Sequence, residues 1–245
     1  TNANNLYPYT SFQPFDAWNH DQEPLSDQWQ KNSEITLYDV NSHALEAMDV
    51  NGNYAATKMD NKQERVYATV ANATYNEFAF SGAEDEPIGG YFGGKVKLEG
   101  EYVEGYGHTG AHWVLSRNGN DKGFSYEITD VQSHGYHASF WSTEPGAAIK
   151  YRERIGGVWS AEKAPQSLPL RSVQVGDEED RWYLHRYNFE VSSGVERVEV
   201  WTEGDGYTLQ DDFRVHPTDA TMTSYVYNEW GELEYILDAN NIYTK

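Results

Sequence analysis

The sequence predicts an all-β protein built from antiparallel strands, and three observations support this fold class. First, apolar side chains alternate in runs such as Trp182/Leu184 and Tyr187/Phe189/Val191, and a period of two is typical of a strand with one buried face. Second, Ser-Ser-Gly and Gly-Asp-Gly separate these runs and read as turns between strands. Third, aromatic residues form 15% of the chain and 19 residues are Tyr, a residue type that favours strands.

Composition limits the classes of partner. The 245-residue chain has a formal net charge of −21 and no cysteine. The negative charge argues against nucleic acid or an anionic membrane as a partner, and it leaves carboxylates available for divalent cations. The sequence contains no apolar run of about eighteen residues, so we expect no membrane insertion. Because the chain starts at Thr1 without an apolar leader, we expect a processed piece of a longer secreted or cell-surface protein.

Residues 1–30 are expected to form an extended arm. Pro8, Pro14 and Pro24 interrupt any regular element. Aromatic side chains such as Trp18 are expected to pack this arm against the domain that follows.

After residue 65, one helix-like segment precedes a series of short strands. Tyr67, Val70, Ala71 and Tyr75 have the spacing of a helical face. The remainder of the chain up to residue 216 reads as about eight short strands separated by turns, a spacing typical of a β-sandwich.

Two segments of the chain, residues 38–54 and 227–243, repeat each other in sequence. When Tyr38 is placed over Tyr227, Tyr54 falls on Tyr243, and an Asp-x-Asn sequence also superposes. Each unit reads as a strand, a turn containing Asn or Gly, and a second strand. Such repetition is typical of stacked arrays, because a single unit cannot bury its own face.

The second unit carries a family resemblance through Tyr225, Tyr227, Gly231, Leu233, Asp238 and Asn240. These residues match the pattern Y-x-Y-x-x-x-G-x-L-x-x-x-x-D-x-N of the YD-repeat, so the unit resembles repeats of bacterial Rhs and teneurin-like proteins. The first unit lacks the glycine of this pattern. The resemblance implies a large secreted protein in which further hairpins follow Lys245.

Three motifs between residues 76 and 216 carry a second resemblance. His108 opens the sequence H-T-G-A-H-W, Tyr136 opens Y-x-x-S-x-W, and Asp211 opens D-D-x-R-V. These stretches are similar to strands of jelly-roll carbohydrate-binding modules, which implies a jelly-roll-like antiparallel β-sandwich. The predicted organisation is therefore an arm with a degenerate hairpin repeat (1–75), a jelly-roll β-sandwich (76–216) and the start of a YD-type hairpin array (217–245).

The second resemblance also implies a structural calcium ion. In those modules an aspartate of the closing strand commonly helps to hold calcium, and Asp212 matches that position. Glu84 and Asp85 would join it if the opening and closing strands pair, because carboxylate oxygens suit calcium. Two other interpretations stay open: a solvated acidic loop around Glu84, and a salt bridge from Asp212 to an arginine such as Arg214.

Aromatic side chains are the candidate sugar platforms. Trp159 lies in a polar loop sequence, and Tyr91 and Tyr106 lie in glycine-rich loops, so these three are predicted to bind ligand through flat exposed rings. Trp141 and Trp201 lie within apolar strands, where a core position is expected.

No catalytic site is predicted. The sequence has no G-x-S-x-G, H-E-x-x-H or P-loop motif. His108 and His112 are four residues apart, but the strand context removes the helical geometry that would bring them to one zinc ion. We therefore expect a non-catalytic module that binds a polysaccharide or a cell-surface glycan within a large secreted YD-repeat protein such as an adhesin. The alternatives are a structural cap or spacer without a ligand and, more weakly, a fragment of a polysaccharide-degrading enzyme.

Overall fold

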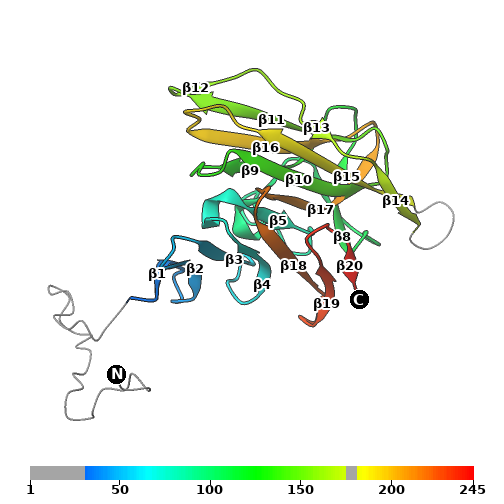
Figure 1. Ribbon diagram of the computed structural model, residues 1–245. Coiled ribbons are helices and arrows are strands. Elements are labelled where there is room, and N and C mark those ends of the chain that lie inside the picture. Colours follow the sequence, from blue (N-terminus) through cyan, green and yellow to red (C-terminus); the bar gives the residue numbers. More distant parts are fainter. Residues whose placement is uncertain (1–30, 175–180) are drawn as a thin grey trace, which may run out of the picture.

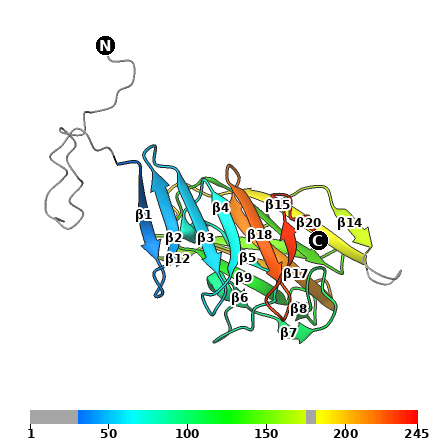
Figure 2. The ribbon, with the colours of Figure 1, turned by 90° about the horizontal axis from the view of Figure 1, so that it is seen from below.

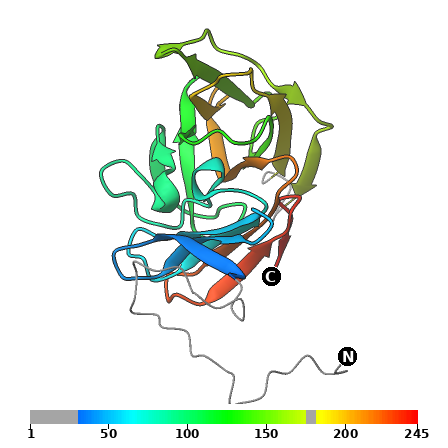
Figure 3. The same ribbon diagram turned by 60° about the vertical axis from the view of Figure 1, so that its left-hand side comes forward.

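The computed structural model describes residues 31–174 and 181–245, so the arm predicted over residues 1–30 lies outside the described residues. Three antiparallel sheets make up almost all of the described chain, which confirms the predicted all-β fold class. Two sheets face each other as a jelly-roll-like sandwich, and the third sheet packs against the outside of that sandwich (Figures 1 and 3). No helix in the described ranges is long and apolar enough to cross a membrane.

The larger layer of the sandwich is an eight-stranded sheet. Its main path is, in spatial order, β13 (Gln166–Ser167), β15 (Arg181–Glu190), β10 (Gly135–Ser142), β17 (Thr208–Pro217), β8 (His112–Ser116) and β7 (Glu101–Glu104). Two further strands pair off this path: β14 (Arg171–Gln174) with β15 and β5 (Ala79–Ser81) with β17.

The facing layer has five strands and encloses the main core. Its order is β12 (Val158–Trp159), β11 (Ala148–Ile155), β16 (Arg197–Glu203), β9 (Lys122–Ile128) and β6 (Lys97–Leu98). The alternation in β9 and β17 directs Phe124 and Phe213 inward, where their rings stack with centroids 5.7 Å apart. Full burial of such a side chain contributes about 1.5–3 kcal/mol, so this apolar interior dominates the stability of the sandwich.

The opening and closing strands of the sandwich are neighbours. β5 pairs antiparallel with β17 through Ser81 opposite Phe213 and Phe80 opposite Arg214. A short 3-10 helix η2 (Tyr75–Glu77) precedes β5, and a second one, η3 (Gly93–Lys95), precedes β6. This pairing brings the segment after β5, which contains Glu84 and Asp85, toward the end of the sandwich where β17 begins.

The third sheet, called the hairpin sheet, joins both ends of the described chain. Its order is β1 (Ser33–Tyr38), β2 (Ala44–Asp49), β3 (Tyr54–Met59), β4 (Val66–Ala71), β18 (Thr221–Tyr227), β19 (Leu233–Leu237) and β20 (Tyr243–Thr244). Figure 2 shows β4 and β18 side by side at its centre. The first and third predicted parts of the chain thus share one sheet, and the division at residues 75 and 216 stays a prediction.

The prediction of a helix over residues 67–75 is wrong for most of that segment. Tyr67, Val70 and Ala71 lie in β4, which pairs with β3 on one side and with β18 on the other. Only Tyr75 lies in the short helix η2. Pairing with strands far away in the sequence overrides a local helical pattern in this segment.

The five turns of the hairpin sheet have one common design. In each turn the side-chain oxygen of an Asp or Asn accepts a hydrogen bond from the backbone N–H four residues later. The N–H of the residue three positions later donates to the backbone carbonyl of that same Asp or Asn. The residue three positions later has a left-handed φ in every turn, and these residues are Ser42, Gly52, Gln63, Gly231 and Asn241. Gly and Asn suit that conformation best.

The repeated hairpins also share their strand register. Tyr38 pairs with Ala44 and Tyr227 pairs with Leu233, and a register shift precedes each tyrosine at the equivalent place. A β-bulge at matching positions of two hairpins extends the sequence repeat to the backbone geometry.

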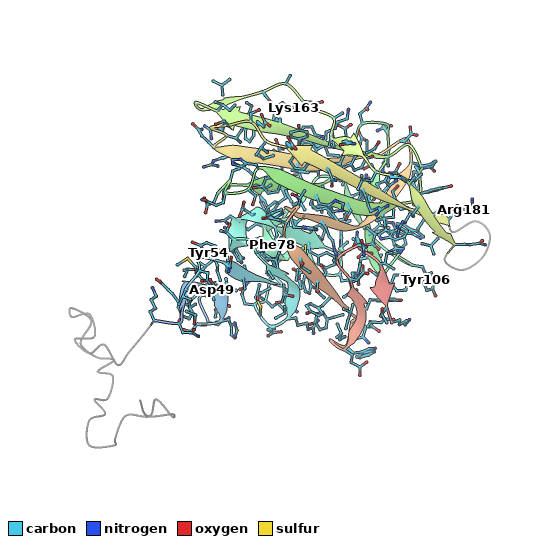
Figure 4. All side chains as sticks on the ribbon, in the orientation of Figure 1. Asp49, Tyr54, Phe78, Tyr106, Lys163 and Arg181 are labelled. Carbon is cyan, nitrogen blue, oxygen red and sulfur yellow. The ribbon has the colours of Figure 1, made fainter. Side chains whose placement is uncertain are left out.

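Apolar and polar contacts together form the seam, the contact surface between the hairpin sheet and the sandwich. Phe78 and Phe80 pack against Met222 and Val226 of β18, and Figure 4 shows Phe78 between the two parts of the molecule. Three buried hydrogen bonds add to these contacts: Arg214 Nη2 to Leu237 O (3.0 Å), Trp141 Nε1 to Asn241 O (2.9 Å) and Asn241 Nδ2 to Asp212 O (2.9 Å).

Candidate functional site

A cleft of about 730 Å³ opens where loops of the sandwich meet turns of the hairpin sheet. The sandwich lines it with residues between 84 and 88 and between 104 and 112, and the hairpin sheet lines it with residues between 60 and 67, residues between 227 and 235, and Lys245. These segments are far apart in the sequence, so the packing of the hairpin sheet onto the sandwich creates the cleft.

Two large aromatic side chains of the cleft stand in solvent. Tyr106 of the β7–β8 loop is 94% exposed, and Trp230 of the β18–β19 turn is 78% exposed. Figure 4 shows Tyr106 at the edge of the molecule on the side of β20. Such exposure contributes little to folding, so packing alone does not explain why these rings line the cleft.

The β7–β8 hairpin places Tyr106 in solvent. The N–H of Gly105 donates to the carbonyl of Ala111 (2.8 Å), which closes the loop. The ring of Trp113 lies directly against Gly105, where an added Cβ would come within 1.9 Å of the ring. Residue 105 therefore has to be glycine for Trp113 to pack there, and the next residue, Tyr106, is directed away from the fold.

Glu84 and His112 contact each other within the cleft wall. Oε1 of Glu84 accepts the N–H groups of Ala111 and His112 (both 2.8 Å), and Oε2 lies 3.1 Å from His112 Nδ1. Gly110 permits this approach, because an added Cβ would lie 2.2 Å from Oε1. Burial raises the pKa of Glu84, against the opposing effect of the hydrogen bonds from His112. On its other side, the imidazole stacks on Tyr102 with centroids 5.1 Å apart.

Asp85 connects the sandwich to the β3–β4 turn. Its Oδ2 accepts the N–H groups of Asn61 (2.9 Å) and Gly93 (2.8 Å). Burial raises the pKa of Asp85, and the two N–H donors act in the opposite direction. The side chain therefore fixes one wall of the cleft relative to the hairpin sheet.

Asp212 lies behind the cleft in a fully buried cluster. Its Oδ2 is 2.7 Å from His108 Nδ1, and its Oδ1 accepts the hydroxyl of Thr109 (2.8 Å). Its side-chain partners are thus His108 and Thr109, whereas Arg214 donates to backbone carbonyls. Burial and the charge of Asp212 raise the pKa of the neighbouring Asp211 well above its usual range.

The predicted calcium ligands do not fit a cation in this arrangement. Glu84, Asp85 and Asp212 each accept hydrogen bonds from a different set of protein donors. An N–H or O–H donor presents positive partial charge to the oxygen, whereas a calcium site needs several free oxygens directed at one centre. Within residues 31–174 and 181–245, no group of three or more His, Asp or Glu is placed to hold a metal ion. Calcium stays a prediction that these contacts do not support.

The predicted ligand-binding aromatics lie in three different places. Tyr106 lines the cleft. Tyr91 forms isolated bridges with Ile88 and Lys97 and does not line it. Trp159 lies on β12, where the guanidinium of Arg152 lies 4.8 Å from the centroid of its ring and covers one face. Ligand binding by Tyr91 and Trp159 stays a prediction.

Sequence reasoning missed the half of the cleft that comes from the hairpin sheet. Tyr227, Trp230 and Tyr235 line this half, but the sequence pattern of their segment predicted only a hairpin repeat. One signal was available in the sequence: Trp230 occupies a turn position, between Asn228 and Gly231, where a large apolar side chain has no core to enter.

Comparisons with known proteins reach only part of the chain. No family model and no curated protein matches the sequence. The CBM22-1 xylan-binding domain of Paenibacillus barcinonensis Xyn10C aligns at 14% identity and a TM-score of 0.39, covering 56% of this chain and 92% of that one.

Two further solved structures align with a similar share of the chain. The CBM22-1–GH10 modules of Clostridium thermocellum xylanase 10B align at 11% identity and a TM-score of 0.35, covering 59% of this chain and 26% of that one. The module TmCBM61, solved with β-1,4-galactotriose, aligns at 18% identity and a TM-score of 0.27, covering 59% of this chain and 91% of that one.

Proposed function

We propose that this protein is a non-catalytic polysaccharide-binding module whose ligand lies in the cleft between the sandwich and the hairpin sheet. The observation that carries the proposal is the exposure of Tyr106 and Trp230 at that cleft. A flat aromatic ring can cover the C–H face of a sugar while its polar edge stays in water. A cleft of about 730 Å³ lies within the range of about 300–1,000 Å³ that is typical of ligand sites.

The surroundings of the two rings suit a hydroxyl-rich ligand. Glu86, Glu104 and Glu229 are exposed side chains of the same cleft, and their carboxylates can accept hydrogen bonds from sugar hydroxyls. A few polar groups around an apolar platform are the usual means by which a site orients its ligand.

We further propose that the module belongs to a larger secreted or cell-surface protein with YD-type hairpin repeats. The common hydrogen bonding of the five turns and the matching bulges before Tyr38 and Tyr227 support a true repeat. The division into an arm with a degenerate repeat (1–75), a sandwich (76–216) and the start of an array (217–245) is part of this proposal.

A glycan array tests the proposed function. We expect retention on at least one polysaccharide, and we expect Tyr106→Ala and Trp230→Ala each to weaken binding at least about tenfold, which corresponds to about 1.4 kcal/mol. The matched control is Tyr207→Ala, because Tyr207 is 62% exposed but does not line the cleft. All three variants should keep the wild-type melting temperature, since an exposed ring stabilises the fold little.

The array also separates the two alternatives. A spacer without a ligand would show no retention on any polysaccharide, and that result would refute the proposal. A fragment of a degrading enzyme would release new reducing ends from the polysaccharide that it binds. We expect no such release.

A further inference from the structure

Carboxylates dominate the charge of the cleft. Seven of its lining side chains are Asp or Glu, and three are Lys or Arg. Four of these carboxylates are engaged within the protein. Glu84 and Asp85 accept backbone N–H groups, as described above, and Asp60 accepts the N–H of Glu64 (2.7 Å). Glu234 forms an ion pair with Lys245 (2.9 Å).

The other three carboxylates of the cleft are those of Glu86, Glu104 and Glu229. All three are exposed and line the cleft. Within the described part of the chain, none of these carboxylates takes part in a hydrogen bond or an ion pair. Glu86 lies in a loop of the sandwich, Glu104 is the last residue of β7, and Glu229 belongs to a turn of the hairpin sheet, so free negative charge lies on both walls.

The basic side chains of the cleft do not balance this charge. Lys245 is paired with Glu234. The guanidinium of Arg65 lies 5.8 Å from the centroid of the Tyr227 ring and packs against Gly231. Only Lys62 is an exposed cation without such a contact among the described residues of the cleft.

The negative charge near the cleft also affects the pKa of Tyr102. Burial raises the pKa of Tyr102, and the charges of Glu84, Glu86 and Glu104 raise it further. The net charge of −21 over the whole chain adds a long-range field of the same sign. A polymer of uronates or sulfated sugars would meet repulsion here both at long range and on contact.

On the basis of the proposed function, we infer that the polysaccharide carries free amino groups, as a hexosamine polymer does. Its sugar rings stack on Tyr106 and Trp230, and its ammonium groups pair with Glu86, Glu104 and Glu229. The aromatic rings select a sugar, and the carboxylates on both walls select a cationic one.

Titration calorimetry with four probes tests this inference at a mildly acidic pH, where hexosamine amines are protonated. The probes are a glucosamine oligomer, the N-acetylglucosamine oligomer of equal length, an oligogalacturonate and oligolysine. We expect the glucosamine oligomer to bind at least about tenfold more tightly than its N-acetylated counterpart and to weaken as salt is added. We expect no binding of the oligogalacturonate.

Variants of the three carboxylates identify the contacts. Glu86→Gln, Glu104→Gln and Glu229→Gln should each weaken binding of the glucosamine oligomer roughly two- to fivefold, the usual effect of an exposed ion pair. They should weaken binding of the N-acetylated oligomer less, because that oligomer has no ammonium group to pair with these carboxylates. The matched control is Glu190→Gln, an exposed carboxylate at the end of β15 that does not line the cleft.

The outcomes separate this inference from the proposed function. Equal affinity for the two hexosamine oligomers, or tighter binding of oligogalacturonate, overturns the inference and leaves polysaccharide binding intact. If oligolysine binds as tightly as the glucosamine oligomer and is insensitive to Tyr106→Ala, the cleft takes a basic peptide and the inference is wrong. Absence of binding to these probes and to every glycan of the array overturns both.

Discussion

The sandwich and the seam are stabilised by different chemistry. Inside the sandwich, buried apolar side chains such as Phe124, Phe140 and Val215 form one continuous core. At the seam, the apolar cluster is smaller, and buried polar groups such as Arg214 and Asn241 carry specific hydrogen bonds. An apolar core tolerates changes of pH, whereas a buried polar contact fails when one partner is removed or changes its charge. We therefore expect the seam to respond to pH and to single substitutions while the sandwich stays folded.

The largest expected effect comes from the sandwich core. Phe213→Ala removes a fully buried ring that stacks on Phe124 and should lower the free energy of unfolding by about 3–5 kcal/mol. Urea denaturation measures this loss, with Tyr207→Ala as a surface control expected within about 0.5 kcal/mol of wild type. A loss below about 1 kcal/mol would contradict the central place of this core.

The next effect is a dependence on pH at His216. Burial, followed by the charges of His137 and Arg214, lowers the pKa of His216 from 6.5 to about 4. The unfolded chain binds a proton near pH 6.5 and the folded chain does not, so this stability is complete above 6.5 and is lost as pH falls through 4. A difference of this size corresponds to about 3 kcal/mol.

Comparison with a variant isolates the contribution of His216. His216→Gln should lose less stability than wild type between pH 6.5 and pH 4 in denaturation curves. His134→Gln is the control, because His134 is exposed. Parallel curves for wild type and His216→Gln would show that His216 does not titrate in this way.

A matched pair of substitutions distinguishes the contribution of the seam hydrogen bond from the contribution of the turn conformation. Asn241→Gly keeps the left-handed backbone but deletes the bond to the carbonyl of Asp212, and it should cost about 1–3 kcal/mol. Ser42→Gly changes the equivalent residue of the β1–β2 turn, where φ is 68°, and should stabilise by up to about 1 kcal/mol. Hydrogen exchange at Leu237 and Tyr243 should accelerate only in Asn241→Gly. Equal effects of the two changes would show that the turn and not the seam matters.

Lys58 offers a smaller change of opposite sign. The residue is fully buried, its Nζ lies 3.5 Å from the centroid of the Tyr75 ring and 3.3 Å from the hydroxyl of Tyr126, and burial lowers its pKa well below the usual range. No carboxylate of the described residues pairs with it. Lys58→Met should therefore raise the stability by about 1 kcal/mol, seen as a higher melting temperature, while Lys62→Met on the surface should not. A lower melting temperature would mean that the contacts with the aromatic rings outweigh the cost of burying the amine.

The smallest expected effect is that of metal removal. Because Glu84, Asp85 and Asp212 already accept protein donors, we expect an excess of chelator to leave the melting temperature unchanged. A fall of several degrees would establish an ion bound only by the folded state, and would restore the calcium site implied by the resemblance.

Local sequence patterns predicted most strands of the sandwich. The alternating run from Arg181 to Pro217 forms β15, β16 and β17, and turns of the hairpin sheet fall on Asp-x-Asn sequences. Such patterns are local because neighbouring residues set both the faces of a strand and the φ of a turn. The segment of β4 shows the limit, since its partners β3 and β18 include one strand about 150 residues away in the chain.

The candidate site could be predicted only in part. A glycine-rich loop identified Tyr106 as exposed, because no apolar pattern surrounds it. Trp159 was predicted as a platform from its polar loop sequence, which does not show that Arg152 of the neighbouring strand covers one face of its ring; ligand binding there stays a prediction. Trp230 could not be connected with Tyr106 from the sequence, since no local feature shows that the β18–β19 turn and the β7–β8 loop line one cleft.

The amino-acid sequence by itself determined the all-β class, the alternation that builds the sandwich and the Asp/Asn turns of the hairpins, because each of these depends on residues a few positions apart. The tertiary structure alone decided that β4 and β18 join the two ends of the chain in one sheet, that Asp212 pairs with His108, and that Tyr106 and Trp230 line one cleft. Each of these depends on contacts between distant segments, which the chain makes only when burial of both surfaces offsets the entropy of closing the long loops between them.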